Sequence, residues 1–263
     1  MRQAILFKKI FLASGISLND PFDFAPAFVE NTTLEINRFI KSAARVLPIN
    51  KDKFSRISGQ RLSRNEFRRR ARLLQRPMER VAFEKRAARE LFQEFRTHTK
   101  VACFSEVLHN SPMWAHYAGN HTGVCYEYAV DWGGGIGGEV YPLSVEYRKS
   151  RPEISTLDMM RFVSERRSGV ETEDSIKIFE SLCLAKSVDW GYEREWRVFL
   201  HSPNPAGYFE FLKLRVERVI FGSNADPMLI DKVADLYGDR VEVCQASISM
   251  TSFDFDVSTV RKP

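Results

Sequence analysis

The sequence predicts an α+β protein with a mixed, mostly antiparallel split sheet and a helical insert. Strand-like segments follow one another in runs instead of alternating regularly with helices, which separates this class from α/β proteins. Sequence signals for helix starts gather in the first hundred residues. A hydrophobic fraction of 44% with 28% charged residues is ordinary for a globular chain. We expect one domain over residues 1–263, with a basic helical insert over residues 31–97.

The N-terminal part predicts one strand followed by three helices. Residues 4–14 read as the strand, and Asn, Asp and Pro after it are turn residues. Capping boxes begin at Thr32 and Ser63, each with Glu three positions later, so that side chain and backbone satisfy each other's hydrogen bonds. The expected helices cover about 32–46, 63–75 and 78–97.

The C-terminal part predicts strands with a few helices between them. Ser111 and Pro112 are a good N-cap and first helical residue for a short helix or tight turn over PMWAHYAG. The expected strands cover 101–105, 123–130, 139–147, 194–201, 208–214, 218–222 and 241–248. The expected helices cover 155–168, 173–187 and 227–237.

Composition narrows the class of protein further. No apolar run approaches the length that crosses a bilayer, and the apolar start is interrupted by Lys8 and Lys9, so we expect no membrane segment and no signal peptide. The four Cys stand in apolar surroundings without a Cys-x-x-Cys pair. Buried free thiols in a cytoplasmic protein are therefore the expectation. The oligomeric state does not follow from the sequence.

One segment makes the protein basic. Residues 51–100 hold 16 Lys and Arg against 6 Asp and Glu. An Arg-rich helix over 61–76 is predicted to bind a target, a nucleic acid or another polyanion, because the planar guanidinium suits phosphate. The residues proposed for this contact are Arg64, Arg68, Arg69 and Arg72. The alternative is a solvated face that pairs with acidic side chains elsewhere.

Two carboxylates in YEREWR are the candidate catalytic residues. In a strand, Glu193 and Glu195 would lie on one face, because side chains repeat every second residue. Such a pair can hold a hydroxyl, orient a nucleophile and stabilise a cationic transition state. Trp190 nearby indicates a cleft wall. The alternative is a strand with a charged solvent face.

Two more segments are candidates for ligand binding. Trp114, His116 and Tyr117 can stack on a flat ring and donate hydrogen bonds, although a packed short helix is the competing interpretation. Asn19, in the turn before Pro21, can face a ligand, or the turn is purely structural. We read the glycines of 133–138 as a loop, because they lack the Lys-Ser/Thr of a phosphate loop. No zinc spacing is present, and no metal is expected.

Several segments in this order resemble a bacterial family called domain of unknown function 2971. They are NDPFD, CFSE, MWAHYAGNHTGVCYEY, AKSVDWGYEREWR and RVIFG, within residues 8–24 and 100–224. The helical stretch 31–97 is longer than that family leads one to expect.

A second similarity, to ADP-ribosyltransferases, rests on the late Glu193-x-Glu195. It implies a split mixed sheet, NAD as the donor, Glu195 on the ribose hydroxyl and Glu193 orienting the acceptor. Nicotinamide would sit among Trp114, His116, Tyr117 and Trp190. The family's first-strand Arg or His is missing here. Toxin and phage-defence effectors are the roles associated with such enzymes.

Two alternatives stay open beside the transferase. The first is a nucleic-acid-binding protein or metal-dependent nuclease, with Glu193, Glu195 and Lys186 around a metal and a phosphate. The second is a non-enzymatic interaction module, whose mark would be glutamates fully paired to neighbours with no adjacent cleft.

Overall fold

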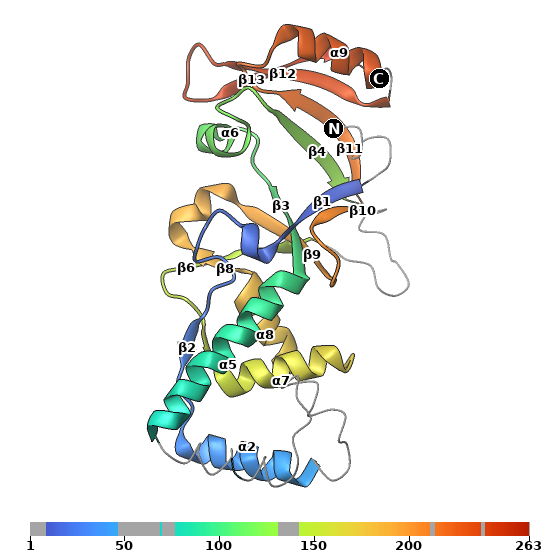
Figure 1. The fold of residues 1–263 in the computed structure, drawn as a ribbon. Coiled ribbons are helices and arrows are strands. Elements are labelled where there is room, and N and C mark those ends of the chain that lie inside the picture. Colours follow the sequence, from blue (N-terminus) through green and yellow to red (C-terminus); the bar gives the residue numbers. More distant parts are fainter. Residues whose placement is uncertain are drawn as a thin grey trace. The chain divides into compact units, whose positions relative to one another are not determined.

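The structure, a computed structural model, describes residues 9–46, 69, 77–130, 142–210, 214–237 and 240–262. These residues form two compact units (Figure 1). The first unit comprises Met1–Ala13, Lys100–Val145 and Val188–Pro263. The second comprises Ser14–Thr99 and Glu146–Ser187. The chain therefore leaves the first unit twice and returns, and the predicted helices of 31–97 share their unit with residues 146–187.

A four-stranded mixed sheet with one covering helix forms part of the first unit. Its order is β13-β12-β11-β4, with β11 and β12 parallel and the outer pairs antiparallel. The parallel pair is joined through helix α9, whose buried side chains pack on the sheet with Val219, Phe221 and Val243 (Figure 1). The bounds are β4 Val124–Val130, β11 Leu214–Phe221, α9 Pro227–Tyr237, β12 Glu242–Ile248 and β13 Phe255–Arg261.

A five-stranded sheet, in the order β10-β1-β3-β9-β5, completes the first unit. Its members are β1 Lys9–Ser14, β3 Thr99–Ser105, β5 Leu143–Ser144, β9 Glu195–His201 and β10 Gly207–Glu210. The two sheets share a core, in which Leu12, Ala102 and Val198 meet Leu214 and Tyr128. Helix α6 (Ser111–Tyr117) and the 3-10 helix η2 (Val188–Glu193) belong to the same unit.

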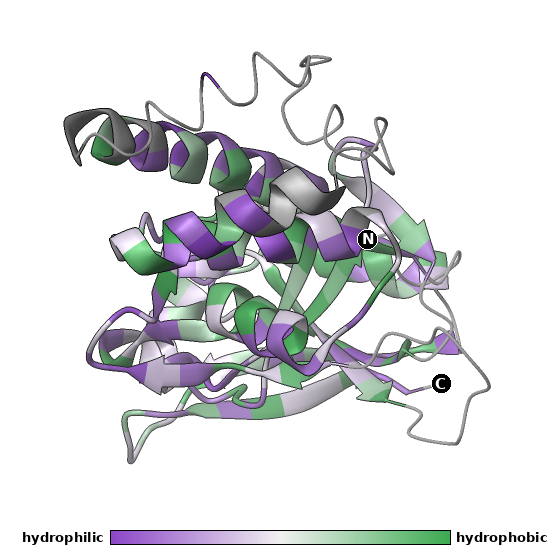
Figure 2. Ribbon diagram, turned by 90° about the horizontal axis from the view of Figure 1, so that it is seen from below, coloured by the Kyte–Doolittle hydropathy of each residue, from purple (hydrophilic) through white to green (hydrophobic). Residues whose placement is uncertain are grey.

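The second unit is mainly helical. Its helices are α2 Thr33–Val46, α5 Pro77–His98, α7 Thr156–Arg167 and α8 Glu173–Cys183, with the 3-10 helix η1 Gly15–Ser17. Buried aromatic rings join them, since Phe95 of α5 stands edge-on to Phe162 of α7 with 5.4 Å between ring centroids. Hydrophilic and hydrophobic bands alternate along the helices in Figure 2, as expected for helices that bury one face.

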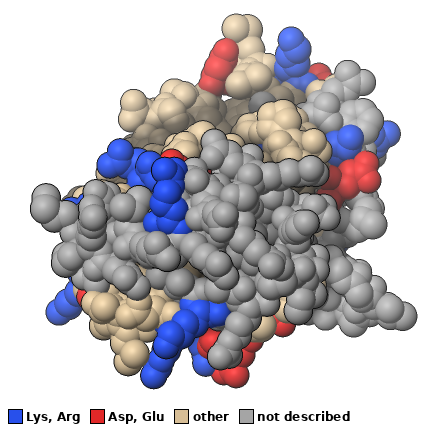
Figure 3. Space-filling model, turned by 60° about the horizontal axis from the view of Figure 1, so that its bottom comes forward, with Lys and Arg blue, Asp and Glu red and all other residues tan. Residues whose placement is uncertain are grey.

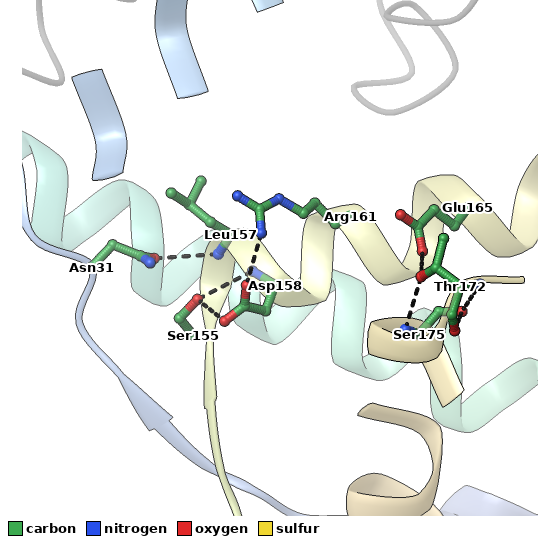
Figure 4. Close-up of polar contacts among 8 residues, drawn as sticks. All are labelled: Asn31, Ser155, Leu157, Asp158, Arg161, Glu165, Thr172 and Ser175. Carbon is green, nitrogen blue, oxygen red and sulfur yellow. Dashed lines mark hydrogen bonds and ion pairs between the residues drawn. The ribbon is translucent and has the colours of Figure 1, made fainter. Parts of the chain in front are cut away.

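Two short parallel strand pairs and a polar cluster connect distant parts of the second unit. The pairs are β2 (Ala27–Val29) with β7 (Glu153–Ser155), and β6 (Glu146–Arg148) with β8 (Ala185–Ser187). Asn31 accepts a hydrogen bond at 3.2 Å from the backbone N–H of Leu157 in the first turn of α7 (Figure 4). The β2–β7 pair and the Asn31 contact join residues more than a hundred positions apart, and the β6–β8 pair joins residues 39 positions apart, so a local sequence pattern carries little sign of them.

The α+β prediction is confirmed, and side-chain caps begin several of the described helices. Thr32 and Glu35 exchange hydrogen bonds as predicted at the start of α2. The predicted box at Ser63 lies outside the described residues. For α6 the cap was predicted one residue late. Asn110 caps it, because its extended backbone lets its side chain accept from the N–H of Met113.

Other differences concern short or polar strands. The sequence predicted one strand over 139–147, but within the described residues the chain divides into β5 and β6, which lie in different units. The predicted helix 173–187 ends at Cys183, and β8 follows. Neither β7 nor β13 was predicted. In β13 most side chains are exposed, so the hydrophobic signal of a strand is weak.

The cysteine prediction is correct in part. None of the four thiols forms a disulfide, and Cys183 and Cys244 are buried. Cys103 is exposed, contrary to the expectation from its apolar neighbours, because its side chain lies near the end of β3, where alternate side chains face outward. Burial raises the pKa of the Cys125 thiol to about 11. Within the described part of the chain, we find no helix that is both apolar and long enough to cross a bilayer.

Candidate functional site

The turn that enters β9 is held by hydrogen bonds from the last residue of β3 and from the segment between β3 and α6. The backbone carbonyls of Tyr192, Glu193 and Arg194 each accept one of them. The donors are the Asn110 amide at 2.9 Å, the Ser105 hydroxyl at 2.6 Å and the Glu106 backbone N–H at 3.3 Å. Three consecutive carbonyls are thus fixed, and this braced turn is rigid at the point where it presents its side chains.

Glu193 is placed by this turn beneath a surface tyrosine. The Tyr117 hydroxyl donates to Glu193 Oε1 at 2.7 Å. Glu193 is 2% exposed, whereas Tyr117 is 51% exposed. A ligand at the surface therefore meets the tyrosine, whose hydroxyl can accept from that ligand while it donates to the carboxylate below.

Glu195 has a different environment. Arg197 forms a two-pronged pair with it, Nε to Oε1 at 2.7 Å and a terminal nitrogen to Oε2 at 3.0 Å. Both residues are buried. The predicted shared face assumed that both glutamates lie in one strand, but Glu193 ends η2, and Arg194, with φ of 42°, stands before β9 begins. The face that Glu195 shares is that of Arg197, two positions on.

Aromatic rings gather beside the braced turn. His116 lies 6.4 Å from Trp190, and Trp190 lies 6.1 Å from Tyr192, between ring centroids. We call His116, Tyr117, Trp190 and Tyr192 the aromatic cluster. His116 and Tyr117 are exposed, and the rings of Trp190 and Tyr192 are partly exposed.

Trp114 does not share that environment. It is 4% exposed, packs near Phe255, and donates its indole N–H to the carbonyl of Leu108 at 2.9 Å. We therefore reassign it from ligand stacking to the core of the first unit, where the apolar side of α6 rests on Ile220 and Ala246.

The remaining predicted residues lie elsewhere. Asn19 is exposed and belongs to the second unit, as does Lys186, which is buried 3.9 Å from Asp23. Arg64, Arg68 and Arg72 lie outside the described residues, as does the 133–138 loop. Arg69 is helical and exposed. On the face drawn in Figure 3, the described Lys and Arg side chains stand in separate groups, some beside Asp and Glu.

The bracing residues Ser105, Glu106 and Asn110 were not among the site residues predicted from the sequence. Glu106 also accepts from the indole N–H of Trp196 at 2.5 Å. The available sequence signal was the Ser105–Glu106 pair of CFSE, a small hydroxyl residue and a carboxylate at the end of an apolar strand. Their partners lie more than eighty residues away, so the sequence alone does not identify their role.

Within the part of the chain that the structure describes, neither a metal site nor the hollow found at the surface of the first unit adds a candidate catalytic group. Among the described residues, no three His, Cys, Asp or Glu side chains are grouped to hold a metal ion. An open hollow of about 530 Å³ lies along Arg215–Arg218, Arg240 and Glu242. Its arginines are largely neutralised, since Arg215 pairs with Glu217 and Arg218 with Glu127.

Fold and site together define an α+β protein with a braced turn that carries a buried carboxylate under an exposed tyrosine. Residues 113–198 match the family model described as Protein of unknown function (DUF2971), which confirms the predicted family resemblance. The match begins in α6 and ends in β9, so it contains the aromatic cluster and both glutamates. No curated protein and no solved structure matches the chain.

Gly222, which follows β11, allows the chain to pass close to the loop after α6. A Cβ on Gly222 would lie 2.1 Å from the carbonyl oxygen of His121, and that loop is held by the bond from the Gly222 N–H to the Gly123 carbonyl at 2.9 Å. We expect Gly222→Ala to lower the free energy of unfolding by about 1–3 kcal/mol, because backbone atoms must separate.

Urea unfolding followed by tryptophan fluorescence measures this effect. Gly207→Ala is the control, since the nearest atom to its Cβ position is the Pro205 carbonyl oxygen at 3.9 Å. A Gly222→Ala protein no less stable than Gly207→Ala would contradict a tight backbone approach.

Proposed function

We propose that this protein is an NAD-dependent, ADP-ribosyltransferase-like enzyme in which Glu193 is the catalytic carboxylate. The observation that carries the proposal is the hydrogen bond from the exposed Tyr117 to the buried Glu193, beside exposed aromatic rings. A carboxylate held in place but shielded from water is suited to stabilise positive charge that develops in a transition state. Glu195, which the sequence favoured for this role, is already neutralised by Arg197.

The residues present fit the donor. Nicotinamide would stack on His116 and Trp190, whose rings are beside each other and partly open to solvent. In the reaction the bond between ribose C1′ and the nicotinamide nitrogen breaks, its electron pair neutralises the pyridinium, and a bond from C1′ to the acceptor forms. The charge on the ribose is oxocarbenium-like, as in glycoside hydrolysis.

Tyr117 and Glu193 would then take the acceptor's proton. The tyrosine hydroxyl accepts it and passes its own proton to Glu193 Oε1, 2.7 Å away. The target is proposed to be a nucleic acid or another polyanion, held by the Arg-rich segment 61–76. A toxin or phage-defence effector is the biological role that fits such an enzyme.

The test is NAD consumption by the purified chain, with and without RNA or DNA. We expect Glu193→Gln to reduce turnover by about 100-fold or more, the range of general acid–base catalysis, because the amide cannot accept a proton. Tyr117→Phe, which removes only the hydroxyl, is expected to reduce it less. Glu217→Gln, an exposed carboxylate of the same unit, is the matched control.

Unchanged consumption in Glu193→Gln would exclude the catalytic role of this residue. Absence of NAD binding and consumption in every condition would exclude the transferase.

The second candidate is a non-enzymatic interaction module. The buried, two-pronged pairing of Glu195 with Arg197 favours it, because one of the two predicted catalytic carboxylates is then part of a structural ion pair. In that case Tyr117→Phe and Glu193→Gln change stability and leave no chemical activity to lose. A magnesium-dependent cleavage of nucleic acid would instead point to the nuclease.

A further inference from the structure

We propose that Arg194 binds the phosphate groups of a nucleotide whose ring stacks on the aromatic cluster. The inference rests on the proposed function, since it names how the donor's pyrophosphate is held. It concerns a residue that the sequence analysis did not single out, between the two glutamates.

The backbone of Arg194 is strained without a local reason. Four non-glycine residues of the described chain have positive φ: Phe24, Asn120, His121 and Arg194. Asn and His are residue types that tolerate this region. Phe24 is fully buried against Phe95, so packing offsets its strain. Arg194 has neither explanation, because its side chain is exposed.

The strain persists because the surroundings impose it. The carbonyl of Arg194 accepts from Glu106, its N–H donates to Gly191, and the carbonyls of the two residues before it are fixed by Ser105 and Asn110. Backbone strain that is held by its surroundings concentrates at binding sites, where it fixes the position of a side chain in advance.

The guanidinium is available for a ligand. Within the described residues, neither an ion pair nor a hydrogen bond is found for its side chain, whereas Arg197, Arg215 and Arg218 each contact a carboxylate. The nearby negative charge of Glu195 is satisfied by Arg197. An unpaired, exposed arginine on a fixed turn contributes little to stability and keeps its full fork of donors.

The side chains that the turn carries, two aromatic rings and a guanidinium, indicate the class of ligand. Trp190 and Tyr192 supply flat rings, and Arg194 supplies a planar cation two residues after Tyr192. A guanidinium binds phosphate by two parallel hydrogen bonds, and rings next to it suit a base or nicotinamide. A ring with attached phosphates, a nucleotide, meets both requirements.

The test compares wild type, Arg194→Gly and Arg194→Lys by calorimetric binding of ADP-ribose and of nicotinamide riboside, which lacks phosphate. Glycine adopts positive φ without strain, so Arg194→Gly should unfold at an equal or higher temperature than wild type. We expect it to bind ADP-ribose at least tenfold more weakly and nicotinamide riboside within twofold of wild type. Lysine should restore ADP-ribose binding in part. Arg215→Gly is the control on exposed arginines.

Two results separate this inference from the proposed function. If NAD is consumed and Arg194→Gly binds ADP-ribose as tightly as wild type, the inference fails while the transferase stands. If ADP-ribose binding depends on Arg194 but no variant consumes NAD, the phosphate site stands while the transferase fails. A wild-type chain that does not bind ADP-ribose overturns the inference, as does a fall in the unfolding temperature that explains the loss of binding.

Discussion

Replacing Arg197 by methionine is expected to lower the free energy of unfolding by about 3–5 kcal/mol. Arg197 is fully buried, and it satisfies both oxygens of Glu195. Without it, the buried carboxylate loses the cation that contacts both of its oxygens, and less of the cost of its desolvation is offset. Methionine keeps the length and much of the volume of the arginine stem, so the expected effect is electrostatic and not a cavity.

Urea unfolding of four proteins tests this explanation. They are wild type, Arg197→Met, Glu195→Gln and the double variant. The double variant should be less destabilised than the sum of the two single changes, because the pair is removed as a unit. Arg215→Met, at an exposed arginine that also pairs with a glutamate, should cost less than about 1 kcal/mol. If the losses of unfolding free energy in the two single variants simply add in the double variant, the ion pair with Glu195 is not the reason that Arg197 stabilises the protein.

Truncating Phe162 to alanine is expected to lower the free energy of unfolding by a similar amount, about 3–5 kcal/mol. The ring is fully buried, stands edge-on to Phe95 at 5.4 Å, and has the guanidinium of Arg166 over its face at 5.6 Å. Its loss removes apolar burial, an aromatic pair and a cation–π contact, and it leaves a cavity among helices of the second unit.

Hydrogen exchange measured by residue locates this effect. Protection should fall in α5 and α7, the helices that meet at Phe162. Phe22→Ala, at a ring that is 60% exposed under Arg151, is the control and should cost little. Wild-type protection in α5 of the Phe162→Ala protein would mean that this ring does not hold the helices together.

The elements that the sequence predicted correctly carry their signals locally. In α2 the Thr32–Glu35 box and the buried Ile36 belong to the same few residues, and the helix follows from them. Similarly, α9 begins at Pro227 and buries Ile230, Val233 and Ala234 at helical spacing. The strands β7 and β8 have three residues each and are defined by partners far along the chain, so no local pattern marks them.

The candidate site divides in the same way. Its residue types, the two glutamates and the rings of MWAHYA and DWGYE, were visible in the sequence. Their roles were not, because the period-two rule assumes one continuous strand, and the positive φ of Arg194 interrupts it between Glu193 and Glu195. Which glutamate has an arginine partner depends on that turn.

By itself, the sequence determined the α+β class, the capped helices, the family match and the short list of chemical groups. Those features depend on residues a few positions apart in the chain or on the overall amino-acid composition. Only the tertiary structure decided that Tyr117 contacts Glu193, that Arg197 neutralises Glu195, that Trp114 is in the core, and that Ser105 and Asn110 brace the turn. Each of these depends on where a side chain or a turn lies in the folded chain, and the distant partners meet only after the strands have paired.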